Sequence, residues 1–255
     1  MKDRLDRVMV ARGLVPSRAR AQAEIKAGTV QVDSVVVRQP SRSVRETATI
    51  QLSDQRVPFV SRGGVKLAHA LDHYRIDPAG QVCLDLGAST GGFTDVMLRR
   101  GVAHVYAVDV GRGQLHASLV EEPRVTNLEA THANLLSPAL VPQAPSLIVC
   151  DVSFISMRKV LGFAMALCAP GASLVSLIKP QFELGPDHIG RGGIVRAGEA
   201  EIVAMLNDVS AWLTAQGWTP RPVIDSPIKG GDGNQEFLIA ADHSAPAPDQ
   251  RKPFP

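Results

Sequence analysis

The chain has 255 residues, 45% of them hydrophobic and 20% charged, and its formal net charge is +2. This length favours one large domain joined to a small one. The first residues lack the apolar stretch of a signal peptide, no segment approaches the roughly 20 apolar residues of a membrane span, and the three cysteines are scattered. These features argue against membrane-spanning and disulfide-rich classes, and we expect a cytoplasmic protein with reduced thiols and no membrane association.

Positive charge is concentrated in the first quarter of the chain. Residues 1–66 contain 13 lysines and arginines against six aspartates and glutamates. This asymmetry is typical of a surface that binds a polyanion such as nucleic acid, although an ordinary solvated surface can have the same composition.

The first 47 residues predict a small unit of two helices and a hairpin. Apolar residues at helical spacing from Leu5 to Leu14 predict a first helix, which Gly13 closes. Ser17 is suited to cap a second helix that ends at Gly28. Residues 29–37 alternate about a central turn and predict a β-hairpin.

This order of elements resembles the small RNA-binding domain named after the S-four ribosomal protein, whose pattern is matched from Leu5 to Val32. The resemblance implies that the unit clasps structured RNA through a basic helix face, where arginines pair with phosphates and shape is read. The alternative is a generic helix-hairpin module. The RNA-binding candidates in this unit are Arg4, Arg18, Arg20 and Lys26.

From Val60 onward, strand and helix patterns alternate, which is typical of a doubly wound, Rossmann-like α/β domain. We expect a small α+β domain with a strand-like connector at residues 1–59, the α/β domain at 60–242 and a disordered tail at 243–255. A third strand is expected just before Asn127. The other predicted strands are Val82–Leu86, Val105–Val110, Ser146–Asp151 and Ala172–Ile178, with a closing antiparallel pair at Arg221–Asp225 and Glu236–Ala241.

The stretch Val82–Thr94, VCLDLGASTGGFT, is the most informative motif. An apolar strand ends in an aspartate, and a glycine-containing loop leads into a predicted helix, as in the floor of a cofactor pocket. The glycine order fits neither the G-x-G-x-x-G of dinucleotide-binding folds nor a P-loop, which needs Lys-Ser/Thr after its last glycine. The pattern is typical of a site for S-adenosylmethionine (SAM).

Two aspartates end the first two predicted strands. Asp109 stands where this fold uses an acid to bind ribose hydroxyls, the alternative being a simple turn residue. Asp85 either orients the loop or lies near the charged end of SAM, and a polar group within residues 127–134 is expected to meet the adenine. The cofactor-binding candidates are Asp85, Gly87, Ala88, Ser89, Gly91, Gly92, Phe93, Asp109 and Val110.

Four charged residues lie at the ends of predicted elements: Lys66, Asp151, Lys179 and Glu236. Open α/β sheets bind ligands at the carboxyl edge of their strands, so we expect these side chains to share one site. A lone buried charge is costly, whereas paired charges can be accommodated. Taken singly, Lys66 and Glu236 can also be surface charges, and Asp151 and Lys179 a structural ion pair.

With SRGG-x-KL, LDLGASTGGFTD, D-x-SFIS, KPQFE and GN-x-E in place, the chain resembles the TlyA family over nearly its full length. These proteins, often labelled hemolysin A, are rRNA 2′-O-methyltransferases in which an S-four-type domain precedes an FtsJ-like catalytic domain. The resemblance implies that the four charged residues are a catalytic Lys–Asp–Lys–Glu tetrad and that SAM is the cofactor. It also implies that the target is a cytidine of 16S rRNA, 23S rRNA or both in ribosomal subunits. His132 and Asn134 stand where the family usually has Asn and Arg.

A ribose 2′-hydroxyl is a very weak acid, so a base is needed only as the new O–C bond forms. A lysine amine can serve when desolvation and a nearby positive charge favour its neutral form, and Lys179 beside Lys66 fits that role, as the resemblance also implies. No metal is expected, because the histidines are scattered. Further RNA-binding candidates are Arg62 and, in a Gly-rich stretch interpreted as a mobile loop over the site or a plain surface loop, Arg191 and Arg196.

Three other functions stay open at this point. An intact tetrad and cofactor loop disfavour an RNA-binding, ribosome-associated factor without catalysis. A pore-forming hemolysin needs an amphipathic, membrane-spanning or export segment, which the sequence lacks. Methyltransferases that act on base amines usually have an Asn/Asp-Pro-Pro-aromatic motif where this chain has Asp151-Val152-Ser153-Phe154. We expect a monomer.

Overall fold

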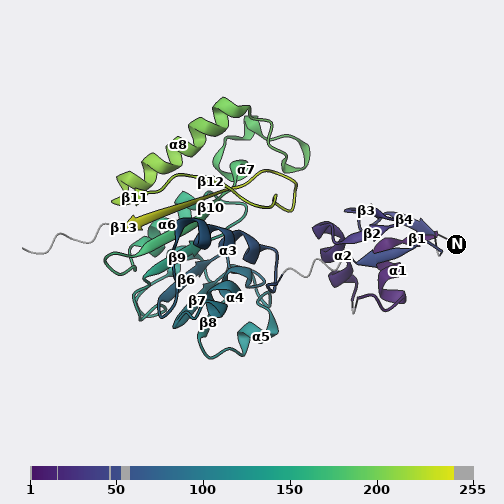
Figure 1. Cartoon of the computed structure of the whole chain (residues 1–255), viewed down its shortest axis with the longest axis horizontal. Helices are drawn as coiled ribbons and strands as arrows, with labels where there is room; N and C mark the ends of the chain where they lie inside the picture. Colours follow the sequence, from purple (N-terminus) through teal and green to yellow (C-terminus); the bar gives the residue numbers. More distant parts are fainter. Residues whose placement is uncertain (1, 16, 46, 53–57, 244–255) are drawn as a thin grey trace, which may run out of the picture. The chain divides into compact units, whose positions relative to one another are not determined.

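The computed structural model describes residues 2–15, 17–45, 47–52 and 58–243. The chain divides into two compact units, residues 1–56 and 57–255, and each is considered by itself (Figure 1). The sequence puts the boundary after residue 59, close to this division. Of the tail expected at 243–255, only His243 is described, and it ends a strand.

The first unit contains the predicted helices and hairpin. Ser17 caps the second helix by accepting a hydrogen bond from the Arg20 N–H. The hairpin turns at Asp33 and Ser34, whose φ angles of 50° and 67° are those of the tight turns that match strand twist. The elements are α1 (Leu5–Ala11), α2 (Arg18–Ala27), β2 (Val30–Val32) and β3 (Val35–Val36).

Of the three other short strands in this unit, two were not predicted from the sequence, and the third lies in the stretch interpreted as a strand-like connector. β1 (Lys2–Arg4) pairs with β4 (Ser43–Arg45), and β5 (Ile50–Leu52) pairs with β2. The predicted connector therefore begins inside the sheet of the first unit. Leu14, expected on the buried stripe of the first helix, lies beyond the end of α1 and is 36% exposed.

The second unit is built on an eight-stranded sheet with the order β11-β13-β10-β9-β6-β7-β8, and β12 also pairs with β13. The central strands run parallel, and the last strand runs antiparallel to β10. The parallel strands are β6 (Val82–Leu86), β7 (His104–Val108), β8 (Val125–Leu128), β9 (Leu147–Cys150) and β10 (Ser173–Ile178). The antiparallel ones are β11 (Trp218–Pro220), β12 (Ile224–Asp225) and β13 (Phe237–His243).

The predicted strand Arg221–Asp225 is wrong as one element. Pairing with β13 is divided between β11 and β12, on either side of residues 221–223. Pro222 lies in the gap, and its missing N–H cannot donate to a sheet ladder. The closing antiparallel arrangement with the last strand is nevertheless confirmed.

Helices cover both faces of the sheet (Figure 1). Successive strand residues alternate between two cores, so Cys83 packs with one set of helices and Leu84 with the other. The first set is α3 (Gly63–Tyr74), α4 (Gly92–Arg99) and α5 (Ala117–Val120), and the second is α6 (Met157–Met165) and α8 (Glu199–Ala215). The short helices are α7 (Pro180–Glu183), η1 (Ala133–Leu135), η2 (Pro186–His188) and η3 (Arg191–Gly193).

Candidate active site

The strand order reverses between β6 and β9, and such a switch point opens a crevice at the carboxyl ends of the strands. Two adjoining pockets, of about 430 and 290 Å³, lie there. The residues that line both are Gly87, Ser89, Asp151 and Ser153. The topology thus places the two predicted residue sets, for cofactor and for catalysis, at one edge of the sheet.

The segment that runs from the end of β6 into the start of α4, residues 85–93, is called the cofactor loop here. Gly87 has a φ of 81°, and a Cβ added there would lie 2.7 Å from the backbone oxygen of Asp151. Gly91, with a φ of 94°, precedes the first residue of α4. Only glycine suits these two positions, because the backbone is left-handed at both and at Gly87 is also pressed against the neighbouring segment.

Asp109 lies at the rim of the larger pocket. Its Oδ2 accepts a hydrogen bond of 2.8 Å from the Ser89 N–H, and its Oδ1 accepts one of 2.7 Å from the Gly111 N–H. These bonds hold the carboxylate in a defined position while it still faces the pocket. Val110 and His132, from the expected adenine segment, line the same pocket, whereas Asn134 is not among its lining residues.

Asp85 lies below the pocket surface and does not line either cavity. Its Oδ2 accepts a hydrogen bond of 2.6 Å from the Thr94 hydroxyl at the start of α4. Complete burial raises the pKa of Asp85 to about 7, opposed by the Thr94 hydrogen bond and assisted by the nearby Asp151. Of the two roles expected for Asp85, this geometry matches the one that orients the loop.

Two observations indicate that the pockets fit SAM. The close approach at Gly87 leaves no room for a side chain over the pocket floor. A fixed carboxylate, Asp109, stands at one end of the larger pocket, beside apolar lining from Val110 and Ala133.

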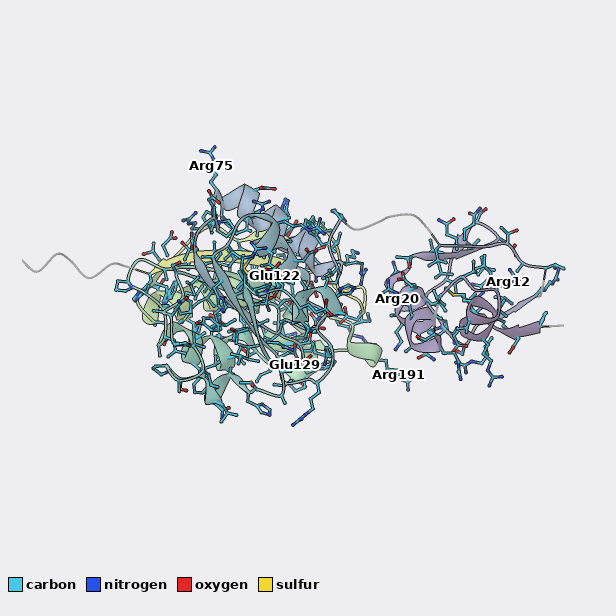
Figure 2. The ribbon with its side chains drawn as sticks, turned by 90° about the horizontal axis from the view of Figure 1, so that it is seen from below. Arg12, Arg20, Arg75, Glu122, Glu129 and Arg191 are labelled. Atoms are coloured by element: carbon cyan, nitrogen blue, oxygen red, sulfur yellow. The ribbon has the colours of Figure 1, made fainter. Side chains whose placement is uncertain are left out.

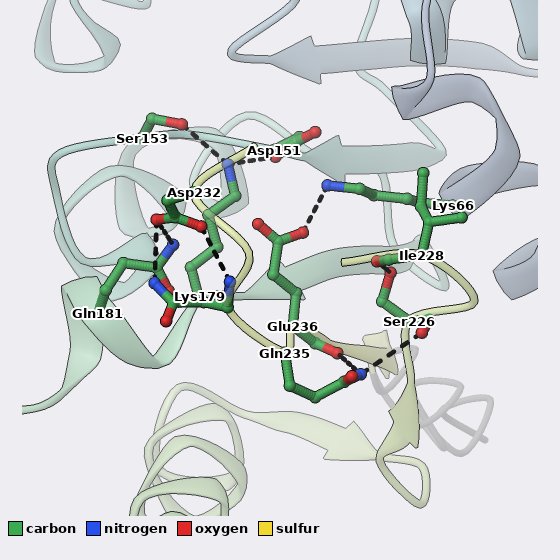
Figure 3. Close-up of polar contacts among 11 residues, drawn as sticks. Lys66, Asp151, Ser153, Lys179, Gln181, Ser226, Ile228, Asp232, Gln235 and Glu236 are labelled. Carbon is green, nitrogen blue, oxygen red and sulfur yellow. Dashed lines mark hydrogen bonds and ion pairs between the residues drawn. The ribbon is translucent and has the colours of Figure 1, made fainter. Parts of the chain in front are cut away.

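Two lysine–carboxylate pairs meet at the smaller pocket (Figure 3). Lys179 Nζ lies 2.6 Å from Asp151 Oδ1 and donates a hydrogen bond of 2.8 Å to the Ser153 hydroxyl. Lys66 Nζ donates to Glu236 Oε2. Both lysine side chains are 10% exposed, so their amines reach the pocket while the rest of each side chain is buried.

Strand register explains why these residues meet. Ile178 pairs with Phe237 in the antiparallel ladder, so the next position, Lys179, is opposite Glu236. Asp151 directly follows β9, the parallel neighbour of β10. Lys66 reaches the same point from the buried face of α3. The structure therefore brings all four predicted tetrad residues together.

Several pocket residues had not been singled out from the sequence. Ser153 anchors Lys179, and Gln114 accepts a hydrogen bond of 3.1 Å from the Ser89 hydroxyl at the larger pocket. Phe154 is 91% exposed with a φ of 66°, and its ring centroid lies 5.5 Å from that of Phe182. The only sequence signal for these positions was their place beside Asp151 and within the glycine-rich motifs.

The predicted RNA-binding residues occupy different surroundings. In the first unit, Asp6 is fully buried and pairs with Arg4 at 3.0 Å and with Arg18 at 3.2 Å. The hydrogen bond from Arg4 is the main cause that holds the pKa of Asp6 well below its usual range. Arg20 pairs with Glu24, and Lys26 is exposed.

In the second unit, Arg62 lines the smaller pocket. Arg191 and Arg196 are exposed, and Arg191 projects from its loop (Figure 2). Among the described residues, no helix combines the length and apolarity needed to cross a membrane, and no cluster of three His, Cys, Asp or Glu side chains is arranged to hold a metal ion.

Family models match both units: residues 59–243 match the FtsJ-like methyltransferases and residues 3–50 match the S4 domain. The chain is 41% identical to the 16S/23S rRNA (cytidine-2′-O)-methyltransferase TlyA of Mycobacterium tuberculosis, over 92% of this chain and 88% of that protein. It is 37% identical to Hemolysin A of Brachyspira hyodysenteriae, over 92% and 98%. A solved structure of a Streptococcus thermophilus protein with a hemolysin name has a TM-score of 0.75 at 34% identity, over 98% and 92%.

The sheet, the cofactor loop and the adjoining pockets define the class of a SAM-dependent methyltransferase with a Rossmann-like fold. The chain belongs to the FtsJ-like methyltransferase family, and an S4 domain precedes its catalytic domain. The predicted fold class, the S-four-type domain, the enzyme class and SAM as cofactor are confirmed.

Proposed function

We propose that this protein transfers a methyl group from SAM to the ribose 2′-hydroxyl of a cytidine in rRNA, acting as a monomer on ribosomal subunits in the cytoplasm. The observation that carries the proposal is the convergence of two lysine–carboxylate pairs on the pocket beside the cofactor loop. The activity that names the Mycobacterium tuberculosis relative, 41% identical to this chain, supports the same substrate. The S4 domain supports RNA as partner.

The larger pocket would hold the adenosine part of SAM, with Asp109 toward the ribose hydroxyls and Val110 beside the base. The cofactor loop, through Gly87 to Phe93, would hold the amino-acid part next to the smaller pocket. When bound, SAM supplies a methyl group made electrophilic by its sulfonium. The chain's own residues then have to orient the hydroxyl and receive its proton.

Lys179 is the proposed base. Its amine lines the smaller pocket, where it can meet a bound 2′-hydroxyl, and it must be in its neutral form to accept a proton there. As the O–C bond forms, the hydroxyl proton moves to Lys179 Nζ, and Asp151 stabilises the resulting ammonium at 2.6 Å. Ser153 holds the amine in place, and Glu236 keeps Lys66 positioned. Much of the rate would then come from holding the hydroxyl in a productive orientation toward the methyl group that SAM would supply.

Phe154 offers a surface for the RNA. Its exposed ring stands beside Ser153, on the rim of the larger pocket, where a nucleobase can stack on an aromatic face. Such stacking contributes about 1–3 kcal/mol per base. The ring of Phe182, whose centroid lies 5.5 Å away, supports Phe154 from one side.

Transfer of tritium from labelled SAM to purified 30S and 50S subunits tests the proposal. Wild-type protein should label one or both rRNAs, and nuclease digestion should recover the methyl group on the ribose of a cytidine. Label on a base, or on no rRNA while SAM binds, overturns the assignment. A non-catalytic ribosome factor predicts RNA binding without label, and a cytolysin predicts lysis of erythrocytes by the purified protein.

A further inference from the structure

Two Gly-rich segments of the second unit are joined by one side chain. They are called the arginine loop, residues 185–196, and the second glycine loop, residues 229–234. The side-chain amide of Asn234 donates to the Gly193 carbonyl at 2.8 Å, and its Oδ1 accepts from the Val195 N–H at 2.9 Å. Asn234 is 5% exposed, so these bonds are made away from solvent.

The arginine loop is itself closed by backbone hydrogen bonds. The Gly190 N–H donates to the Ile194 carbonyl at 2.7 Å, and the Arg196 N–H donates to the His188 carbonyl at 2.8 Å. Asn234 therefore forms its hydrogen bonds with a loop of defined conformation. Arg191 and Arg196 are exposed on that loop.

The second glycine loop also lies directly over the catalytic pair. A Cβ added to Gly230 would lie 2.6 Å from Glu236 Oε1, so the backbone there packs against that carboxylate. Asn234 is two residues before Glu236, and its own N–H donates to Asp232. Asp232 accepts a hydrogen bond of 3.1 Å from Gln181, which is two residues after Lys179 (Figure 3).

We propose that Asn234 is a positioning residue that couples the arginine loop to the Lys66–Glu236 pair. The inference rests on the proposed function. In this proposal, Arg191 and Arg196 bind RNA phosphates and so fix the position of the arginine loop. Among the described residues, Asn234 makes the side-chain hydrogen bonds that join this loop to the second glycine loop. The position of Asn234 in turn sets the position of the Glu236 carboxylate, two residues further on. RNA binding thereby affects the position of the Lys66 amine, which donates a hydrogen bond to Glu236.

Asparagine suits this position because its amide supplies a donor and an acceptor from one rigid plane. Aspartate keeps the acceptor for Val195 but loses the donor to Gly193 and faces the carboxylate of Asp232. Alanine removes these two bonds and a third, which the side-chain amide donates to Asp232 Oδ2 at 2.9 Å, and it leaves two backbone groups of the arginine loop without their partner.

The test compares wild type, Asn234→Ala and Asn234→Asp in single-turnover methyl transfer to ribosomal subunits. We expect the rate at saturating subunits to fall by about tenfold to a hundredfold, as for a small misplacement of catalytic groups, with SAM affinity within about twofold of wild type. Amide hydrogen exchange should show lost protection at Val195 in Asn234→Ala, whereas Asn234→Asp, which keeps that acceptor, should retain it. Ser173→Ala, which removes a bond to Asp242 at the opposite end of β10, is the control for a structural loss alone.

A normal rate at saturating subunits in Asn234→Ala, with Val195 unprotected, overturns the inference, as does an equal rate loss in Ser173→Ala at matched thermal stability. If Asn234→Ala does not fold, Asn234→Asp decides the result alone. Wild-type protein that labels no rRNA overturns the proposed function and this inference together, whereas an active wild type without the selective loss overturns the inference only.

Discussion

Lys179 and Asp151 directly follow neighbouring parallel strands, and Lys179 Nζ lies 2.6 Å from Asp151 Oδ1. The contact joins the KPQFE and D-x-SFIS motifs, which are 28 residues apart at these two positions in the sequence. A buried ion pair is weak evidence of stabilisation, because desolvation opposes the attraction between the charges. Its position at the mouth of the pocket, with a lysine amine exposed to the cavity, is therefore better explained by chemistry than by folding.

Replacing the proposed base separates charge from proton transfer. Lys179→Arg keeps a cation beside Asp151 but cannot lose its proton near neutral pH, and Lys179→Ala removes the amine. Both should lower single-turnover methyl transfer by about 10² to 10⁴, with SAM affinity little changed. The control is Lys159→Ala, which removes an exposed lysine from α6. An arginine variant as active as wild type would exclude Lys179 as the base.

Breaking the Lys66–Glu236 ion pair should lower the free energy of unfolding, and a second substitution at its partner should restore most of the loss. Lys66→Met leaves the charge of Glu236, which is 3% exposed, without its partner, and we expect a loss of about 3–5 kcal/mol in the free energy of unfolding. Combining it with Glu236→Gln should recover most of that loss while methyl transfer stays absent. Urea denaturation and the transfer assay measure the two quantities. A double variant as unstable as the single one contradicts this account.

Asp85 predicts a pH dependence of stability. Its pKa is about 7 in the folded protein and about 4 in the unfolded chain, so the folded state holds the extra proton between these values. Its contribution to the free energy of unfolding is therefore complete below about pH 4 and is lost as the pH rises through 7, at about 1.4 kcal/mol per unit of pKa difference.

Asp85→Asn removes that loss, so the variant should gain stability relative to wild type at pH 8 and much less at pH 5. Urea titrations at the two pH values, without SAM, measure the difference. Asp208→Asn on the exposed side of α8 is the matched control and should show no such change. An equal difference at both pH values would mean that Asp85 is ionised throughout.

The S4 domain can be tested through salt dependence. Arg18 uses one N–H for Asp6, and a guanidinium has five. If Arg18 also contacts a phosphate, Arg18→Ala should weaken binding to subunits and lower the slope of log affinity against log salt by about one. Filter binding at several salt concentrations measures the slope. Arg75→Gln, an exposed arginine after α3 (Figure 2), should leave it unchanged.

Local sequence patterns were sufficient to predict most helices and strands of the fold. The capped helix from Ser17 to Gly28 and the parallel strands were predictable because a cap, a helical stripe and an apolar run involve residues close in sequence. β1 and β4 were not, because the strand with which each pairs lies about 40 residues away. Pro222 was a local signal for the division between β11 and β12, but it did not specify which residues of β13 each strand meets.

For the site, the sequence alone predicted the chemical parts: the cofactor loop, Asp109 and the four charged residues of the tetrad. Only the tertiary structure decided their partners, namely Ser153 for Lys179, Asp6 for two arginines of the S4 domain, and Asn234 for the arginine loop. The reason is physical. Residue identity and short spacing set what a side chain can do, whereas packing and strand register set which distant group it meets.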